Sequence, residues 1–565
     1  MAGPAHERAP GCAGDPLSRF EVIRRDGLAR ISHLSVEGRD IVLPSAGEAD
    51  TLFPGLAGSS LENVPLDADP GFAARYLPAG DTLPVRVHPA VDRDVGSGTC
   101  VMVPCWHTAL ADPRKYVEWL VRLKERLPPD TAFYAPAAAV PSNISLLCYT
   151  GFDLFDFTAV DLASARGEFC LPEGVFPADL MEEGACSCPG CREGDLFRHN
   201  RAALLRELAL VRMHIASSSL RDLVESRSRM DSRYVSIIRF LDRESHFLEP
   251  RIPVSRPGTF LATSGESLFR TEVRRFADRV VNRYIPPAAD VAVLLPCSAK
   301  KPYFLSQSHR RFMEAVSGRA LELIVTSPLG LVPRDLERVY PAAHYDVPVT
   351  GYWDAEEKAW IAGVIAQFFR KHRFRRVIAH LEGGALDAAG MAAEMASIDL
   401  ECTTGGDRAT SRAALNALSG ALSGEKPVTH DLVRATASYQ FDTAVDTKGF
   451  TLKERFPDLK VFRGMEPLFS LDPGTGLLRP TFGGWELIPA GYRVEIDAFV
   501  PSGDILAPGV VGADPRIREG DEVFVTGPLA VATGRAAMPG PEMVRSRRGV
   551  AVKVRKVKTP GGKHV

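Results

Sequence analysis

The chain has 565 residues, a length that predicts about three to five domains. With 45% hydrophobic and 24% charged residues it has the composition of a soluble globular protein, and a net charge of −2 argues against a general electrostatic attraction to nucleic acid. No apolar run approaches the roughly 20 residues that span a bilayer, and residues 1–20 lack the apolar core of a signal peptide. The ten cysteines, several of them clustered, fit metal binding or catalysis in the cytoplasm better than a disulfide framework.

Residues 20–235 alternate short apolar segments with amphipathic ones. Residues 99–104 and 131–135 have the composition of strands, whereas residues 113–127 and 200–226 have the period of amphipathic helices. This alternation predicts a parallel α/β sheet or barrel. We therefore expect an α/β multidomain protein whose first domain covers residues 20–235.

Three cysteines close together predict a metal site in this first domain. Cys186, Cys188 and Cys191 are followed by a predicted helix that carries His214. Three thiolates and one imidazole complete a tetrahedral Zn²⁺ site with no open position, which predicts a structural role. His199 competes as the fourth ligand, but the short loop after Cys191 disfavours it. The alternative is a set of unrelated buried thiols with a histidine on the helix surface.

The C-x-C-x₂-C pattern with a distant histidine resembles the zinc motif of tRNA-guanine transglycosylases, and residues 20–31 and 151–156 resemble segments of the same family. The resemblance implies that Asp156 stands where the family's nucleophile attacks the ribose. No motif marks a second catalytic carboxylate, for which Asp92 and Asp94 are candidates. Only about 165 residues precede the cysteines, against roughly 250 for a full (β/α)₈ barrel, so we expect a shortened TIM-barrel-like transglycosylase module. Asp156 can alternatively be a structural carboxylate at the end of a strand.

Residues 265–405 predict a second α/β domain, after a linker over 251–264 that is broken by prolines. Continuous apolar runs at 291–295 and 321–326 indicate buried parallel strands. A long helix is predicted over 353–372 and a further strand over 376–380.

The strand predicted over 291–295 is directly followed by Pro296-Cys297-Ser-Ala-Lys-Lys301-Pro-Tyr303-Phe-Leu-Ser306-Gln-Ser-His309. A cysteine just past the carboxyl end of a parallel strand sits where α/β sheets bind ligands. A helix that begins near Ser306, together with the charge of Lys300 or Lys301, would favour the thiolate. Hydroxyl and acid–base groups come from Tyr303, Ser306 and His309. The segment predicts a reactive thiol with acid–base neighbours, and the alternative is a buried structural cysteine.

The pattern P-C-x₃-K-P-Y-x₂-S-x₂-H resembles the one that sets archaeosine synthases apart from transglycosylases, and every specified position is present. The resemblance covers nearly the whole chain and includes residues 327–334 and 340–348. It implies action on tRNA that carries 7-cyano-7-deazaguanine in its D-arm. The nitrile becomes an amidine by addition of an amine, with lysine the expected donor, and a radical-SAM partner subunit releases archaeosine. No three-cysteine cluster for an iron–sulfur centre is present in this chain.

The chemistry of a nitrile suits the motif. Attack by the thiolate of Cys297 would give a thioimidate, a better acceptor for an amine than the nitrile itself. His309 or Lys301 could protonate the nitrile nitrogen. Direct addition of the amine is the alternative within this family. Outside it, a working transglycosylase and a non-catalytic tRNA-binding subunit stay open.

Beyond residue 405, a stretch rich in Thr, Ser, Gly and Ala over 406–425 predicts a boundary. Residues 427–490 predict a small α+β module, and period-two stretches over 491–560 are typical of a small β-barrel. Residues 505–512 and 548–553 resemble a PUA domain, which implies that tRNA binds there. A protein-interaction barrel is the alternative. Eight Lys or Arg and no acidic residue lie within 545–565, a charge that can contact phosphates or stay solvated. We also expect the protein to be an oligomer.

Overall fold

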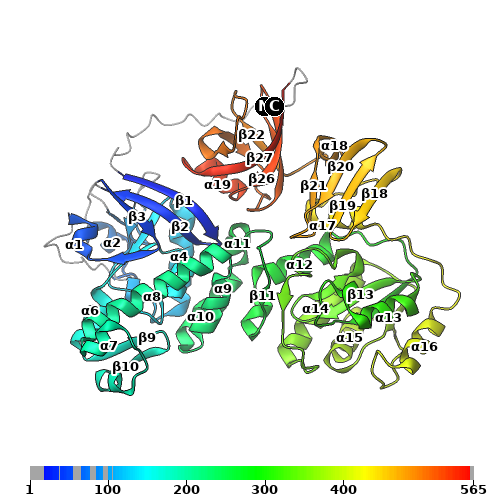
Figure 1. Cartoon of the computed structure of the whole chain (residues 1–565), viewed down its shortest axis with the longest axis horizontal. Coiled ribbons are helices and arrows are strands. Elements are labelled where there is room, and N and C mark those ends of the chain that lie inside the picture. The colour runs from blue at the N-terminus through cyan, green and yellow to red at the C-terminus, as the bar shows by residue number, and fades with distance from the viewer. Residues whose placement is uncertain are drawn as a thin grey trace. The chain divides into compact units, whose positions relative to one another are not determined.

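The structure is a computed structural model that describes residues 18–36, 38–54, 65–76, 84–92, 100–104 and 106–559 (Figure 1). Its contacts divide the chain into two units. Unit 1 comprises Met1–Phe247, Asp504–Gly512 and Met538–Ala551, and unit 2 comprises Leu248–Gly503, Ala513–Ala537 and Val552–Val565.

Unit 1 contains an antiparallel and a parallel sheet. The antiparallel sheet has the order β1-β2-β3, from strands Ser18–Asp26, Ala29–Val36 and Arg39–Leu43. The parallel sheet has the order β4-β8-β7-β6-β5, from strands Ser45–Gly47 (β4), Val85–Arg86 (β5), Cys100–Met102 (β6), Ala132–Ala135 (β7) and Leu154–Asp156 (β8). Five parallel strands are fewer than the eight of a full barrel, so the predicted shortened module is confirmed.

A buried ion pair joins these two sheets. Arg30 of β2 lies 2.6 Å from Asp153, which directly precedes β8, and both side chains are almost fully buried. Arg30 also donates to the carbonyls of Pro129 and Thr131 at 2.8 and 2.7 Å. The arginine is therefore fully engaged where the two sheets meet, as a buried charge requires.

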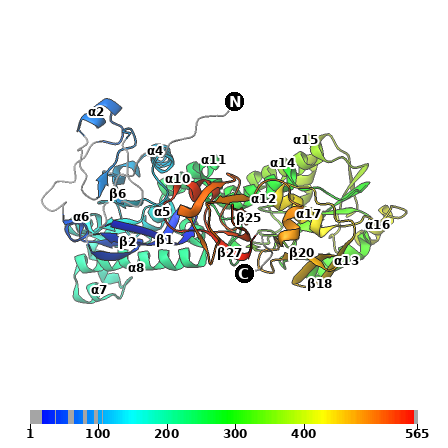
Figure 2. The same ribbon diagram turned by 90° about the horizontal axis from the view of Figure 1, so that it is seen from above.

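Helices cover these sheets, and the long helix α8 packs on β1 and β2 (Figure 2). The helices are Ala49–Leu52 (α1), Pro70–Tyr76 (α2), Trp106–Ala109 (α3), Pro113–Arg126 (α4), Ile144–Tyr149 (α5), Thr158–Ala165 (α6), Pro189–Glu193 (α7), Leu196–Ser217 (α8), Leu220–Ser228 (α9), Ser232–Arg243 (α10) and Ser245–Leu248 (α11). A hairpin of Glu168–Leu171 (β9) and Gly174–Pro177 (β10) precedes the cysteine cluster. The single helix predicted over 200–226 is two helices, because Ser218 adopts a left-handed conformation (φ 56°) that ends α8.

Unit 2 begins with a doubly covered α/β domain whose sheet has the order β14-β13-β12-β16-β17. Its strands are Val291–Pro296 (β12), Leu321–Thr326 (β13), Gly330–Pro333 (β14), Arg376–Ala379 (β16) and Leu400–Cys402 (β17), all parallel except β14. Its helices are Thr271–Asn282 (α12), Gln307–Val316 (α13), Ala355–Lys371 (α14), Gly383–Ala396 (α15) and Arg412–Ala421 (α16). A separate pair of short parallel strands consists of Phe260–Leu261 (β11) and Tyr345–Asp346 (β15).

The central strand β12 is buried on both faces, as its continuous apolar run predicts. Ala292 and Leu294 face a core formed with α12, α14 and α15, whereas Val291, Val293 and Leu295 face a core formed with α13 and α16. Two covered faces leave the carboxyl edge of the sheet as the place where loops and ligands can meet.

Two stretches predicted as connections are ordered parts of unit 2. Arg275 of α12 donates to the carbonyls of Glu249, Ile252 and Pro253 at 2.7, 2.8 and 2.8 Å, which ties the expected linker to the α/β domain. Helix α16 lies inside the expected boundary over 406–425 and buries Leu418 in the core on one face of β12.

The rest of unit 2 is built mainly from antiparallel sheet. A four-stranded sheet consists of Phe450–Arg455 (β18), Asp458–Arg463 (β19), Glu466–Leu471 (β20) and Leu478–Pro480 (β21), with helices Leu432–Phe441 (α17) and Phe482–Glu486 (α18) beside it. The C-terminal sheet has the order β23-β27-β26-β25-β22-β24. Its elements are Arg493–Ile496 (β22), Ile505–Leu506 (β23), Val510–Ala513 (β24), Glu522–Thr526 (β25), Val531–Ala536 (β26), Val550–Lys558 (β27) and the helix Gly540–Arg545 (α19). The predicted small α+β module and C-terminal β-barrel are both present.

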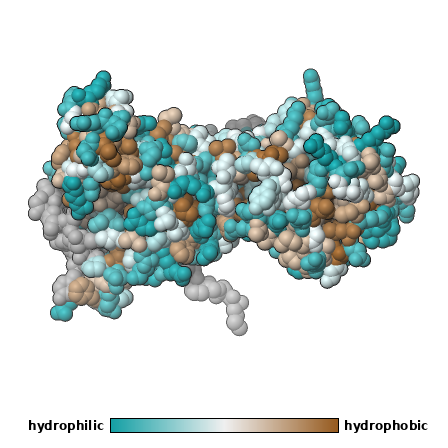
Figure 3. Space-filling view, turned by 90° about the horizontal axis from the view of Figure 1, so that it is seen from below, coloured by the Kyte–Doolittle hydropathy of each residue, from teal (hydrophilic) through white to brown (hydrophobic). Residues whose placement is uncertain are grey.

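Within the described part of the chain, no helix is long and apolar enough to cross a membrane. The face drawn in Figure 3 mixes hydrophilic with hydrophobic residues.

Candidate active site and metal centre

The predicted reactive cysteine lies at the carboxyl edge of the sheet in unit 2. Cys297 directly follows β12, and Thr326 is the last residue of the neighbouring parallel strand β13. The two strands end side by side, so that the side chain of Thr326 forms a hydrogen bond with the thiol of Cys297. The thiol is half-buried.

The pKa of the Cys297 thiol is raised rather than lowered. Burial raises it, and this effect exceeds the opposing effects of the Thr326 hydrogen bond and the positive charge of Lys301. The expectation that the helix beginning near Ser306 would by itself favour the thiolate is therefore wrong for this structure. Ionisation of Cys297 depends on its polar neighbours.

Lys301 is held between an aromatic ring and two anionic groups. Its Nζ lies 4.0 Å from the centre of the Tyr345 ring, a cation–π contact. Burial lowers the pKa of Lys301, while the charges of Cys297 and Asp346 oppose that change. A lysine with a lowered pKa gives up its proton more readily than one in water.

Tyr303 belongs to a row of buried hydroxyl groups. Its OH lies 2.6 Å from the OH of Tyr345, which in turn lies 2.5 Å from Oγ1 of Thr326. Burial raises the pKa of both tyrosines far above neutrality, so both keep their protons. Tyr303 thus reaches the cysteine through two further hydroxyl groups.

Ser306 and His309 have positions that differ from the predicted ones. Ser306 is the N-cap of α13, and its Oγ accepts from the backbone N–H of His309 at 3.2 Å. Nδ1 of His309 accepts from Arg334 at 3.0 Å, and burial together with that arginine lowers the pKa of His309 to about 3. The imidazole is therefore neutral at physiological pH. The expectation that His309 protonates the substrate as an imidazolium is wrong.

Arg334 is itself locked into a buried ion network. It lies 2.6 Å from Glu322 and 3.1 Å from Glu337, and all three side chains are at most a tenth exposed. Glu337 also accepts from the backbone N–H of Phe304 at 2.9 Å. The network fixes the motif segment to β13 and to the turn after β14.

Asp156, at the end of β8 in unit 1, is buried and fully hydrogen-bonded. Its Oδ2 accepts from the hydroxyl of Tyr134 at 2.7 Å, and its Oδ1 accepts from the backbone N–H of Thr158 at 2.9 Å. The N–H of Ala137 lies 3.1 Å from both oxygens. This is the arrangement of a carboxylate that holds loops together. Of the two candidates for a second carboxylate, Asp92 is 91% exposed and faces Arg126 at 3.7 Å, and Asp94 lies outside the described residues.

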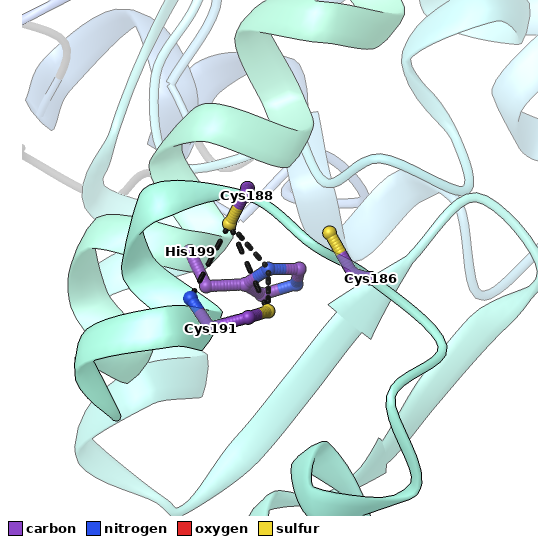
Figure 4. A group of neighbouring side chains, drawn as sticks. All are labelled: Cys186, Cys188, Cys191 and His199. Carbon is purple, nitrogen blue, oxygen red and sulfur yellow. Dashed lines mark hydrogen bonds between the residues drawn. The ribbon is translucent and has the colours of Figure 1, made fainter.

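The three predicted cysteines form a cluster with a histidine (Figure 4). The ligand atoms of Cys186, Cys188, Cys191 and His199 all lie within 4.8 Å of one another. Nδ1 of His199 lies 3.4 Å from the sulfur of Cys188 and 3.2 Å from that of Cys191, and the two sulfurs are 3.7 Å apart. The cluster can hold a metal ion.

The local turn explains why His199 reaches the cluster. Cys188 is the N-cap of α7, which ends at Gly194 in a left-handed conformation (φ 70°), and α8 then begins with its N-cap at Asp195. A Cβ at Gly190 would lie 2.4 Å from the backbone N of His199, so only glycine permits this approach. The chain turns back on itself within a few residues.

His214, the predicted fourth ligand, lies elsewhere, and this prediction is corrected. It is near the end of α8, about 22 Å along the helix from His199 at 1.5 Å per residue. Its Nδ1 forms hydrogen bonds with the hydroxyl and the carbonyl of Ser219 at 2.8 and 3.2 Å, where it helps to cap the helix.

The donor set fits a metal cation. Nε2 of His199 lies 3.0 Å from the carbonyl of Cys170, to which it can only donate, so the tautomer leaves Nδ1 free toward the sulfurs. Burial and the neighbouring sulfurs raise the pKa of Cys191 to about 12, as expected for crowded thiols that lack a neutralising charge. Three sulfurs and one nitrogen are a tetrahedral set with no place for a further ligand.

Part of the basic C-terminal run is used inside the protein. In unit 1 Arg545 donates to the carbonyls of Glu125 and Leu127, both at 3.1 Å, and in unit 2 Arg555 forms two 2.8 Å hydrogen bonds with Glu522. The side chains on β27 that remain exposed to solvent are Lys553, Lys556 and Lys558. These three are available to a polyanion.

Three residues of the site in unit 2 were not found from the sequence: Thr326, Tyr345 and Arg334. Thr326 ends a predicted strand beside the cysteine strand, and the rule that ligands gather at carboxyl ends of parallel strands could have indicated it. No local pattern marks Tyr345 or Arg334, because both reach the motif from distant segments.

A reactive-cysteine α/β domain followed by a C-terminal RNA-binding fold defines a class of RNA-modifying enzyme. Two family models match: "Domain of unknown function (DUF5591)" over residues 273–422, and the PUA domain over 493–558, as predicted. The chain is 40% identical, over 79% of its length and 77% of the relative, to "Archaeosine synthase subunit alpha" of Methanosarcina acetivorans. It is 37% identical to "Archaeosine synthase" of Haloferax volcanii, over 95% of its length and 99% of the relative.

The chain belongs to the archaeosine synthase family. A more distant relative is the "tRNA-guanine(15) transglycosylase" of Methanothermobacter thermautotrophicus, 25% identical over 84% of the chain and 72% of that protein. The expected relation to the transglycosylases is therefore confirmed.

Proposed function

We propose that this protein converts the nitrile of 7-cyano-7-deazaguanine, in the D-arm of tRNA, to an amidine during archaeosine biosynthesis. The observation that carries the proposal is the cluster of Cys297, Lys301 and Tyr303 at the carboxyl edge of the α/β sheet, in a chain of the archaeosine synthase family. These side chains supply a nucleophile, a proton donor and a polar wall, which are the groups that nitrile addition needs.

In the proposed reaction the sulfur of Cys297 forms a bond to the nitrile carbon, and the nitrile nitrogen takes up a proton from Lys301. The product of this step is a thioimidate. An amine then adds to the same carbon, the carbon–sulfur bond breaks, and the thiolate of Cys297 leaves. The nucleotide retains the amidine, and the cysteine is regenerated without a change of oxidation state.

Lysine is the amine donor that we propose, and a radical-SAM partner subunit would release archaeosine from the lysine adduct. The name "subunit alpha" of the Methanosarcina relative supports a partner for that protein, and we extend this to the present chain. The cytoplasm, where tRNA is modified, is the compartment that we assign.

We also propose a structural role for one zinc ion and an RNA-binding role for the C-terminal domain. The three cysteines and His199 would hold the ion, which supplies no chemistry to the reaction because no ligand position stays open. The PUA match and the exposed lysines on β27 support binding of the tRNA backbone.

The transglycosylase alternative is not favoured. Both oxygens of Asp156 are occupied by hydrogen bonds from Tyr134, Ala137 and Thr158, an arrangement that does not leave a free nucleophile. The transglycosylase relative is also less similar than the two synthases.

The test is mass spectrometry of nucleosides from precursor tRNA that has been incubated with the protein and lysine. The wild-type protein should form a lysine-containing amidine nucleoside, and Cys297→Ser should lose nearly all product while it retains tRNA affinity, because a serine hydroxyl is scarcely ionised. Asp156→Asn is the matched control and should lose far less. If Asp156→Asn abolishes product and Cys297→Ser does not, the chemistry belongs to unit 1 and the proposal fails.

A further inference from the structure

A row of three hydroxyl groups leads from the sulfur of Cys297 into the core of the α/β domain. Thr326 is hydrogen-bonded to the thiol, its Oγ1 lies 2.5 Å from the OH of Tyr345, and that OH lies 2.6 Å from the OH of Tyr303. The two tyrosines are at most 2% exposed. The sequence motif contains only Tyr303.

The protons in this row can be placed in order. Each hydroxyl group has one proton to donate, and a thiolate can only accept. When Cys297 is ionised, Thr326 donates to the sulfur, Tyr345 donates to Thr326, and Tyr303 donates to Tyr345. Three aligned donors polarise one another, and such a chain stabilises the charge at its end more than one hydroxyl does.

Thr326 has a second acceptor within reach. Its Oγ1 lies 3.2 Å from the carbonyl oxygen of Ser327, to which it can donate when the sulfur is protonated. The hydroxyl of Thr326 therefore has a partner in either state of the thiol.

The ring of Tyr345 has a second contact that serves the same charge. Lys301 lies over this ring at 4.0 Å, and its charge acts on the sulfur of Cys297. The charged or titratable groups that face the sulfur are Lys301, Tyr303 and Tyr345, and Asp346 acts on Lys301. Tyr345 thus contacts both the row of hydroxyl groups and the lysine.

We infer that Thr326 and Tyr345 are positioning residues that stabilise the thiolate of Cys297. Thr326 acts by the hydrogen bond that it donates to the sulfur, and Tyr345 acts by the hydroxyl behind Thr326 and by the ring that holds Lys301. The inference rests on the proposed function only in that the thiolate is the nucleophile there. The thiolate itself can be measured without tRNA.

The experiment measures the rate at which iodoacetamide alkylates Cys297 in the full-length protein as a function of pH, read by mass spectrometry of the peptide. Thr326→Val removes the hydroxyl at nearly constant shape, Thr326→Ser restores it, and Tyr345→Phe removes the second hydroxyl but keeps the ring. Circular dichroism and thermal unfolding show whether each variant is folded. Thr326→Ser and Tyr345→Phe keep the inference testable if the valine variant does not fold.

We expect Thr326→Val to raise the apparent pKa of the Cys297 thiol by about one to two units, as loss of a hydrogen bond to a charged group predicts. Thr326→Ser should behave like the wild type. Tyr345→Phe should raise the pKa in the same direction by less. The kcat of amidine formation should fall with the thiolate fraction, while the Kd for tRNA stays the same.

Alkylation profiles of folded Thr326→Val and Tyr345→Phe that coincide with the wild-type profile would overturn the inference. That result is distinct from failure of the proposed function, which is a wild-type protein that forms no amidine. Shifted profiles with no amidine product would support the positioning role and reject the reaction.

Discussion

Replacement of His199 by alanine removes the only nitrogen among the four donor atoms of the cysteine cluster. The three sulfurs remain, but they surround a space that now lacks its fourth ligand. Helix α8 also loses a tie at its first turn, because Nε2 of His199 donates to the carbonyl of Cys170 in β9. We expect His199→Ala to weaken zinc binding and to destabilise unit 1 together.

The magnitude follows from the number of ligands. Structural zinc sites contribute about 10–16 kcal/mol of apparent binding free energy, so one ligand of four carries about 3 kcal/mol. This corresponds to an affinity about a hundredfold lower. Loss of the hydrogen bond to Cys170 adds about 1 kcal/mol to the loss of stability.

The assay is competition with a chromophoric zinc chelator, together with the zinc content after dialysis and a urea unfolding curve. His214→Ala is the matched control, since it removes an imidazole from the same helix at about 22 Å from the cluster. It should keep zinc and lose only the stability of its contacts with Ser219, about 1 kcal/mol. If His214→Ala loses the metal and His199→Ala keeps it, the ligand assignment is refuted.

Three further predictions concern unit 2. Arg334→Met should cost about 3–5 kcal/mol of unfolding free energy in urea melts, because Glu322 and Glu337 are then buried without a partner; a loss under 1 kcal/mol would contradict this. Glu249 is buried, but two arginines lower its pKa to about 2, so its contribution of up to about 3 kcal/mol is present above about pH 4 and is lost as the pH falls toward 2; Glu249→Gln should flatten this part of the acid unfolding curve, and parallel curves would argue against the ion pairs. Alanine at three exposed lysines should weaken tRNA binding and reduce its salt dependence by about 0.9 per lost phosphate contact, and an unchanged salt slope would place the RNA elsewhere: Lys553, Lys556 and Lys558.

The buried strands of the α/β domain were predictable almost to the residue, since a parallel strand covered on both faces has a continuous apolar run. β13 covers the predicted residues 321–326, and β12 extends one residue beyond the prediction. Helix α16 was missed because its small and polar residues resemble a linker. Its buried stripe is short, and Leu418 and Leu422 carry most of it.

The site residues were predictable where the chemistry is local. Three cysteines in one short turn specify a metal site at any register, but the choice between His199 and His214 depends on how tightly the chain turns at Gly190. Tyr345 was beyond prediction for a different reason. Its hydroxyl meets that of Tyr303 only after β11 and β15 have paired, and no spacing in the sequence encodes that contact.

The neutral state of His309 bears on where the proton of the proposed reaction comes from. Its Nδ1 is held by Arg334, and its pKa of about 3 removes it as an acid at neutral pH. Burial raises the pKa of Cys297 and lowers that of Lys301, so both groups tend toward their neutral forms, and each ion is favoured only when the other is charged. A proton that moves from the thiol to the lysine creates the nucleophile and its acid in one step. The thiolate can then add to the nitrile carbon while the ammonium protonates the nitrogen, and no third acid is needed.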